Sequence, residues 1–205
     1  MPDDNHFLRE LNDTVDCAEG WVRMEEMREN NEAGLEDLRA ELAAEREALL
    51  AVVPGVDELA LSWPTRNAGW TVRDVLAHVL ASDADLIALL AEAARSSTGG
   101  IRMPGLQEHQ REMARWAEAT PRSFARDLRK RGSRWRELLT APPSSDLAIT
   151  VSGNWWPQNA LSGSASSTPE ESGGVRPLAD VVADWRGHDA QHTEDVRLAL
   201  GTKQT

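Results

Sequence analysis

The sequence of 205 residues has no tyrosine, only two phenylalanines and a single cysteine, Cys17. One cysteine excludes a disulfide bond within the chain, which is typical of proteins in a reducing compartment. The N-terminus lacks the charged and then apolar pattern of a signal peptide, and no apolar run approaches the roughly 20 residues that cross a bilayer. We therefore expect a soluble, cytoplasmic protein without a membrane partner.

Tryptophan is the abundant aromatic residue, with eight copies. Because Trp brings the largest apolar surface of any side chain, most of these residues should lie in the core or line a pocket. Hydrophobic residues make up 40% of the chain and charged residues 27%, which is a globular composition. The length suits one domain with a hydrophobic core of its own.

Most of the net charge of −12 lies at the start of the chain. Residues 1–50 hold 15 acidic and 5 basic side chains, a net of −10, so the other 155 residues carry about −2. This acidity argues against a nucleic-acid partner, because phosphate binding needs a basic surface. Residues 111–136 are an exception, with nine basic and three acidic side chains. They form either a solvated helix face near the acidic start of the chain or a surface that attracts a substrate with carboxylates.

The chain divides into an acidic N-terminal arm over residues 1–33 and a helical domain over residues 34–201. Leucines in residues 34–53 follow a helical spacing, with Ala and Glu between them. Pro54-Gly55 ends this first long helix.

The second long helix has a clear start. Thr71 is a good N-cap, and Asp74 stands at the third helical position, where a carboxylate favours the start of a helix. Trp70, just before the cap, can pack over the first turn. We expect this helix to span residues 72–95, up to a Ser/Gly-rich run.

Three more helices complete the expected all-α domain: a short one over residues 105–118, a long one from Thr120-Pro121 to about residue 139, and a last one over about 177–200. Residues 140–177 between the last two are expected to be irregular. Their Ser/Gly-rich part predicts flexibility, and Trp155 and Trp156 should pack against another part of the protein.

His188 and His192 are four residues apart, which puts both imidazoles on one face of a helix. The same face continues at a spacing of three and four residues through Leu178, Val181, Trp185, Asp195 and Ala199. This is the inward stripe of a bundle helix, where unsatisfied imidazoles are costly. A shared metal ion removes that cost; a hydrogen-bonded or surface pair is the alternative. The sequence HDAQH lacks the glutamate of the zinc-protease motif.

His78 is our third candidate ligand. It lies in the apolar sequence DVLAHVL of the second helix, which must pack against the last one, although a single histidine in such a place is more often an ordinary core residue. Three histidines would leave a fourth metal position for water or substrate. An ion there can lower the pKa of bound water toward about 7 or stabilise a thiolate.

Two aspartates are candidates to orient these ligands, because a metal-bound histidine usually donates its other N–H to a carboxylate or carbonyl. Asp74 and Asp184 each precede a candidate ligand by four residues. The remaining histidines, His6 and His109, stand among polar residues, and we expect both at the surface without a role.

Two segments resemble the DinB-like, or YfiT-like, superfamily. GWTVRDVLAHVLASD is similar to the part of that superfamily in which a Trp precedes the capped helix with the first histidine, and DWRGHDAQHTEDV is similar to its closing helix. They stand about 110 residues apart in the right order. The likeness covers roughly residues 35–200, and each motif is short, while their combination is fairly specific.

The resemblance implies a four-helix bundle in which His78, His188 and His192 hold zinc, nickel or a similar ion. The superfamily includes transferases and isomerases that use mycothiol or bacillithiol, and many members named only as metal-dependent hydrolases. Members are often dimers, so a homodimer is implied here. The acidic arm and the loop with Trp155 and Trp156 depart from the family pattern.

These features favour a metal-dependent enzyme that acts on a small molecule. It would be a thiol S-transferase or isomerase with a low-molecular-weight thiol as cosubstrate, or a hydrolase. Candidate pocket residues are Trp155, Trp156 and Trp185. The alternative is a non-catalytic protein whose metal is structural and which binds a small molecule or a partner, because no catalytic residue beyond the ligands is identifiable.

Overall fold

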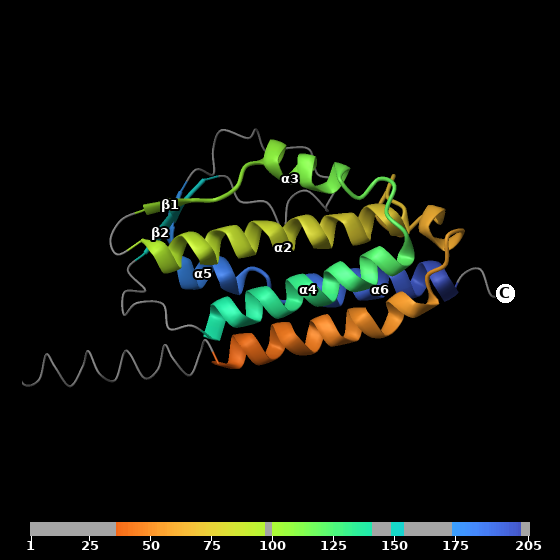
Figure 1. Cartoon of the computed structure of the whole chain (residues 1–205), viewed down its shortest axis with the longest axis horizontal. Helices are drawn as coiled ribbons and strands as arrows, with labels where there is room; N and C mark the ends of the chain where they lie inside the picture. The colour runs from red at the N-terminus through yellow and green to blue at the C-terminus, as the bar shows by residue number, and fades with distance from the viewer. Residues whose placement is uncertain (1–35, 97–99, 141–148, 154–173, 202–205) are drawn as a thin grey trace, which may run out of the picture. The chain divides into compact units, whose positions relative to one another are not determined.

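The computed structural model describes residues 36–96, 100–140, 149–153 and 174–201 (Figure 1). Residues 36–52 are helical. The other long helices are α2 (Val72–Arg95), α4 (Pro121–Thr140) and α6 (His188–Gly201). Shorter helical segments are η1 (Val53–Gly55), η2 (Ala60–Ser62), α3 (Leu106–Ala114) and α5 (Leu178–Ala183). This mostly helical architecture confirms the all-α fold class.

Helix α2 is the central element, with α3, α4 and α6 packed against it (Figure 1). Every residue from Val75 to Asp83 is buried, which means that neighbours cover all sides of this part of the helix. Its start is as predicted: the Thr71 side chain accepts a hydrogen bond from the Asp74 amide, and the Asp74 carboxylate accepts one from the Thr71 amide at 2.8 Å. This reciprocal capping box fixes where α2 begins.

The hydrophobic core fills the space between α2, α4, α6 and the helix over residues 39–52. Its almost fully buried side chains include Leu49, Val53, Leu61, Val72, Val75, Leu76, Val79, Leu80, Phe124, Leu128 and Val196. Within the described ranges, every helix is too short or too polar to span a bilayer.

A small sheet was not expected from the sequence. Its strands are β1 (Gly100–Arg102), β2 (Thr150–Ser152) and β3 (Val175–Pro177), in the order β1-β2-β3. β1 pairs with β2 in parallel, and β2 pairs with β3 antiparallel. The prediction of irregular structure throughout residues 140–177 is therefore wrong at the two strands. Strands of three residues are too short to show an alternating apolar pattern.

The last predicted helix is broken in two. α5 ends at Ala183 and α6 begins at His188, with a turn between them in which Gly187 has φ +76°. This left-handed conformation suits glycine, and the Gly187 amide donates to Glu45 Oε1 at 2.8 Å. The break leaves the inward stripe intact, since all seven of its residues, from Leu178 to Ala199, are buried.

Arg46, on the first described helix, is 1% exposed and forms the centre of a buried ion cluster. Its guanidinium donates to both carboxylate oxygens of Asp83 at 2.7 Å, to Asp189 Oδ2 at 2.5 Å and to the Leu128 carbonyl at 3.0 Å. A Cβ at Gly132 of α4 would lie 3.2 Å from Arg46 Cγ. The missing side chain on α4 therefore makes room for the arginine. This cluster, Arg46 with Asp83 and Asp189, joins the first described helix to α2 and α6.

Candidate metal centre

Three buried histidines meet between α2 and α6. His78 lies in the second turn of α2, His188 is the first residue of α6, and His192 follows one turn later. One ring nitrogen from each of the three lies within 4.8 Å of the others, and His78 Nε2 is 3.1 Å from His188 Nε2. The three residues are 5%, 7% and 0% exposed, respectively. The structure thus brings together the three candidate ligands identified in the sequence.

The environment of His78 and His188 favours neutral imidazoles. Burial lowers the pKa of His78 well below its usual range, and the neighbouring histidines lower it further. Burial also lowers the pKa of His188 to about 4, although Asp189 opposes the shift. A neutral imidazole is the form that binds a metal ion, so both rings are ready to coordinate without first losing a proton.

The inward nitrogens fit a cation. His192 Nε2 is buried and has no hydrogen-bond partner among the described residues. His78 Nε2 and His188 Nε2 face each other, so one of the two atoms presents a lone pair to the space between the rings. A buried lone pair without a donor is costly, and a divalent ion shared by the three nitrogens removes that cost.

Each ring also has a partner at its outward nitrogen. His78 Nδ1 lies 3.0 Å from His109 Nε2, and His192 Nδ1 lies 3.1 Å from Asp195 Oδ2. His188 Nδ1 lies 3.4 Å from Asp189 Oδ1, a longer and weaker contact. All three rings therefore turn Nε2 inward and Nδ1 outward, the usual arrangement of metal-bound histidines with supporting partners.

Arginines hold the two α6 carboxylates. Arg46 bonds to Asp189, while Arg66 and Asn67 donate to Asp195, the latter at 2.9 Å. Burial alone would raise the pKa of both aspartates, but Arg46 lowers that of Asp189, and His192 and Arg66 lower that of Asp195. Both carboxylates are therefore anionic acceptors for the histidines beside them.

The structure places the two predicted orienting aspartates elsewhere. The Asp74 carboxylate accepts from the amide and hydroxyl of Thr71, and the Asp184 carboxylate accepts from Arg176 at 2.7 Å. The prediction that they support His78 and His188 is therefore wrong. A spacing of four residues brings two positions onto one face of a helix, but these carboxylates accept from other donors instead.

His109 was expected at the surface and is instead 5% exposed. It lies on α3 and hydrogen-bonds to both His78 and Asp85. Its polar surroundings in the sequence suggested exposure, yet Glu112, one turn later, is buried as well. The inward face of α3 is thus partly polar, a pattern that hydrophobic periodicity does not detect.

One described tryptophan contacts one of the three histidines. The Trp70 ring meets the His78 ring edge-on, with 5.1 Å between the ring centroids. Trp185, a predicted pocket residue, is 5% exposed, and its Nε1 has no hydrogen-bond partner among the described residues. The other two candidates, Trp155 and Trp156, lie outside the described residues, as do His6 and Cys17.

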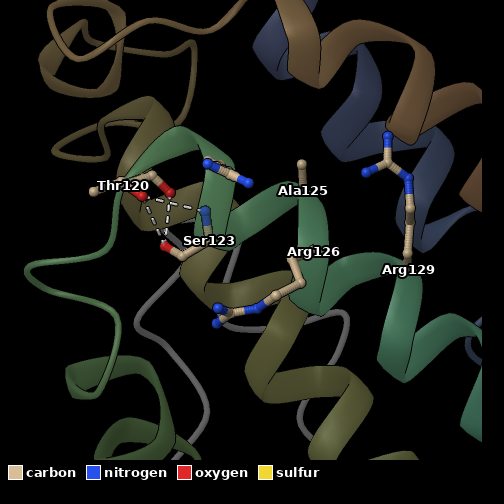
Figure 2. Close-up of a pocket in the computed structure, with 6 residues that line it drawn as sticks. Thr120, Ser123, Ala125, Arg126 and Arg129 are labelled. Carbon is tan, nitrogen blue, oxygen red and sulfur yellow. Dashed lines mark hydrogen bonds between the residues drawn. The ribbon is translucent and has the colours of Figure 1, made fainter.

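The basic stretch over residues 111–136 has more than one environment. Figure 2 shows a pocket of about 410 Å³ beside the start of α4, lined by Thr120, Arg122, Ser123, Ala125, Arg126 and Arg129. The Thr120 hydroxyl accepts from the Ser123 amide at 3.2 Å, which confirms the predicted cap. Arg131, by contrast, turns inward and donates to the Leu80 carbonyl and to Glu112. No candidate metal ligand lines this pocket, so it is separate from the three histidines.

The family model described as the mycothiol maleylpyruvate isomerase N-terminal domain matches residues 42–167, about three fifths of the chain. The match includes His78 and His109 and ends before His188 and His192. No curated protein and no solved structure matches the chain.

Proposed function

The chain belongs to the mycothiol maleylpyruvate isomerase N-terminal domain family, part of the DinB-like superfamily, and on that premise we propose that it is a metal-dependent enzyme acting on a small molecule. We propose His78, His188 and His192 as the ligands of one divalent ion. The observation that carries the proposal is the convergence of three buried ring nitrogens, one of them without any partner among the described residues.

The donor set favours zinc or nickel. Imidazole nitrogen suits zinc, copper, iron and nickel, whereas magnesium and calcium prefer oxygen ligands. Three protein ligands leave a coordination position for an exogenous group, which is typical of catalytic zinc sites. These considerations support a catalytic ion.

The reaction we favour is a thiol-dependent transfer or isomerisation. The family description names mycothiol, so a low-molecular-weight thiol is our proposed cosubstrate. When bound, the ion supplies Lewis-acid activation of a thiol sulfur or of water. Asp189 and Asp195 orient the ligand rings, and the Trp70 ring closes one side of His78. Hydrolysis of a small electrophile is the other reaction that this site would support.

The burial of the three histidines is also compatible with a second function, in which the metal is structural. The three histidines are at most 7% exposed, which is also expected of a closed structural metal site. A non-catalytic protein that uses its metal for stability and binds a small molecule or a partner is therefore the second candidate.

Metal analysis tests the site. We expect wild-type protein to hold about one zinc or nickel ion per chain and His192→Ala to hold almost none, because two remaining imidazoles bind far more weakly. His6→Ala is the matched control and should retain the metal. Full retention of metal by His192→Ala would refute the three-histidine site.

A thiol panel then tests the reaction. Metal-loaded protein would be mixed with mycothiol, bacillithiol or no thiol, and with an electrophilic substrate. Product that forms only with a thiol supports the transferase or isomerase, and turnover without thiol supports the hydrolase. No turnover from fully loaded protein supports the structural role. Analytical ultracentrifugation of the same samples tests our further proposal of a homodimer.

A further inference from the structure

His109 connects two residues of α2 that lie two helical turns apart. His78 and Asp85 are separated by seven residues, so both point from one face of α2 toward α3. His109 Nδ1 lies 2.6 Å from Asp85 Oδ2, and His109 Nε2 lies 3.0 Å from His78 Nδ1. All three side chains are buried, with exposures of 5% to 8%. Neither His109 nor Asp85 is one of the three converging residues.

For a neutral His109 beside an ionised Asp85, these contacts allow only one direction for the protons. An aspartate carboxylate accepts hydrogen bonds, so the close contact with Asp85 requires the proton of a neutral His109 to be on Nδ1. His109 Nε2 then carries a lone pair and accepts from His78. The proton of His78 must therefore be on Nδ1, and its Nε2 lone pair points toward His188 and His192.

The other tautomer of His109 is incompatible with its contact to Asp85. With its proton on Nε2, a neutral His109 would donate to His78 and turn a lone pair toward the Asp85 carboxylate at 2.6 Å. The proton of His78 would then move to Nε2 and face the other two ligands, where it would block a cation. The negative charge of Asp85 thus selects the metal-binding form of His78 through the ring of His109.

We propose that Asp85 and His109 are positioning residues that hold His78 in its Nδ1–H tautomer and thereby prepare its Nε2 for the metal ion. The inference rests on the proposed metal centre. It differs from the support of His188 and His192, each of which faces an aspartate directly. Among the described residues no arginine bonds to Asp85, so its carboxylate depends on His109. Burial raises the pKa of Asp85, and the hydrogen bond from His109 opposes that shift.

Zinc affinity is the first test, measured by competition with a chromophoric chelator. His109→Phe keeps the ring volume but removes both hydrogen bonds, and we expect Zn²⁺ to bind about 10–100-fold more weakly. His109→Gln should recover most of the affinity, because its amide oxygen can accept from His78 while its NH₂ group donates to Asp85. Gln110→Ala, an exposed change on the same helix, is the control and should bind Zn²⁺ as wild type does.

The tautomer itself is the second test and needs no metal. Histidine ¹⁵N shifts from long-range ¹H–¹⁵N spectra of the metal-free protein should show His78 with its proton on Nδ1. Asp85→Asn should populate the other tautomer, since an Asn amide can donate to His109 Nδ1. A purely structural role for His109 would lower thermal stability without changing either the tautomer or the affinity.

The outcomes separate the two proposals. Wild-type protein that binds neither zinc nor nickel refutes the metal centre, while the ¹⁵N spectra still decide on the positioning role. The positioning role is overturned if His78 carries its proton on Nε2 in the wild type, or if the Asp85→Asn variant keeps the wild-type tautomer. Wild-type affinity in a folded His109→Phe variant would overturn it as well. If His109→Phe does not fold, Asp85→Asn and His109→Gln provide the same comparison.

Discussion

The two sides of the candidate metal centre are supported in different ways. On α6, His188 and His192 face aspartates of their own helix, and each aspartate is held by an arginine. On α2, His78 reaches a carboxylate only through the ring of His109 on α3. The histidines on α6 thus contact aspartates that are paired with arginines. His78 on α2 contacts the ring of His109, which in turn contacts a single carboxylate, that of Asp85.

Because of this difference, substitutions on the two sides should affect stability and metal affinity to different extents. Asp189 belongs to the buried ion cluster with Arg46 and Asp83, so damage on the α6 side should lower stability together with metal affinity. The contacts through His109 involve only one charged group, the Asp85 carboxylate. Substitutions of His109 or Asp85 should therefore lower metal affinity more than stability. Three variants test this comparison, from the largest expected effect to the smallest.

Arg46→Met should destabilise the metal-free protein by about 3–5 kcal/mol, because it leaves Asp83 and Asp189 buried without their cation. Urea unfolding measures the free energy. Arg134→Met is the control: this arginine pairs with Glu137 on the surface of α4, and its loss should cost less than about 1 kcal/mol. Equal stability of the two variants would mean that the buried cluster does not anchor the α6 side.

Asp195→Asn should weaken zinc binding by about 10–100-fold, since this carboxylate accepts directly from His192. Competition with a chelator gives the dissociation constant. The change should exceed that of Asp85→Asn, which acts through a second ring. Asp184→Asn alters a carboxylate that holds Arg176, and wild-type affinity is expected. A larger loss in Asp85→Asn than in Asp195→Asn would reverse the order of the two sides.

Gly187→Ala should cost about 1–2 kcal/mol of stability, because alanine would be forced into a left-handed conformation at φ +76°. No atom lies within 4 Å of the added Cβ, so the penalty comes from the backbone alone. Gly201→Ala, which also meets nothing within 4 Å and lacks a positive φ, should be neutral in the same thermal unfolding experiment. If the two variants unfold at the same temperature, the turn before α6 tolerates another conformation.

Local signals in the sequence predicted the long helices well. The capping box of Thr71 and Asp74 marks the start of α2, and Thr120-Pro121 marks the start of α4. The spacing of His188 and His192 predicted their shared face, because that relationship lies within one turn of one helix. The helix break at Gly187 was missed, since the buried stripe continues across it and apolar spacing alone does not register a change of backbone direction.

Contacts between separate elements were much harder to infer. His78 was assigned largely through family resemblance, and His109 was missed because its partners lie 24 and 31 residues away on another helix. Asp74 and Asp184 were assigned by spacing, whereas the choice among possible acceptors depends on which donors the folded chain brings nearer. Polar contacts of this kind follow from tertiary geometry, and the sequence pattern does not contain them.

Gly132 has a consequence for how this sequence can change over time. Any larger side chain at position 132 would crowd the Arg46 side chain, and loss of Arg46 would leave Asp83 and Asp189 buried without a cation. The effects of substitutions at these four positions on stability are therefore coupled. Replacing Arg46, Asp83 and Asp189 together by apolar residues should be tolerated better than replacing one of them. Among relatives with the same architecture, we expect positions 46, 83, 132 and 189 to vary as a set, so that the residue at position 132 of α4 indicates whether the buried ion cluster next to the candidate metal ligands is present.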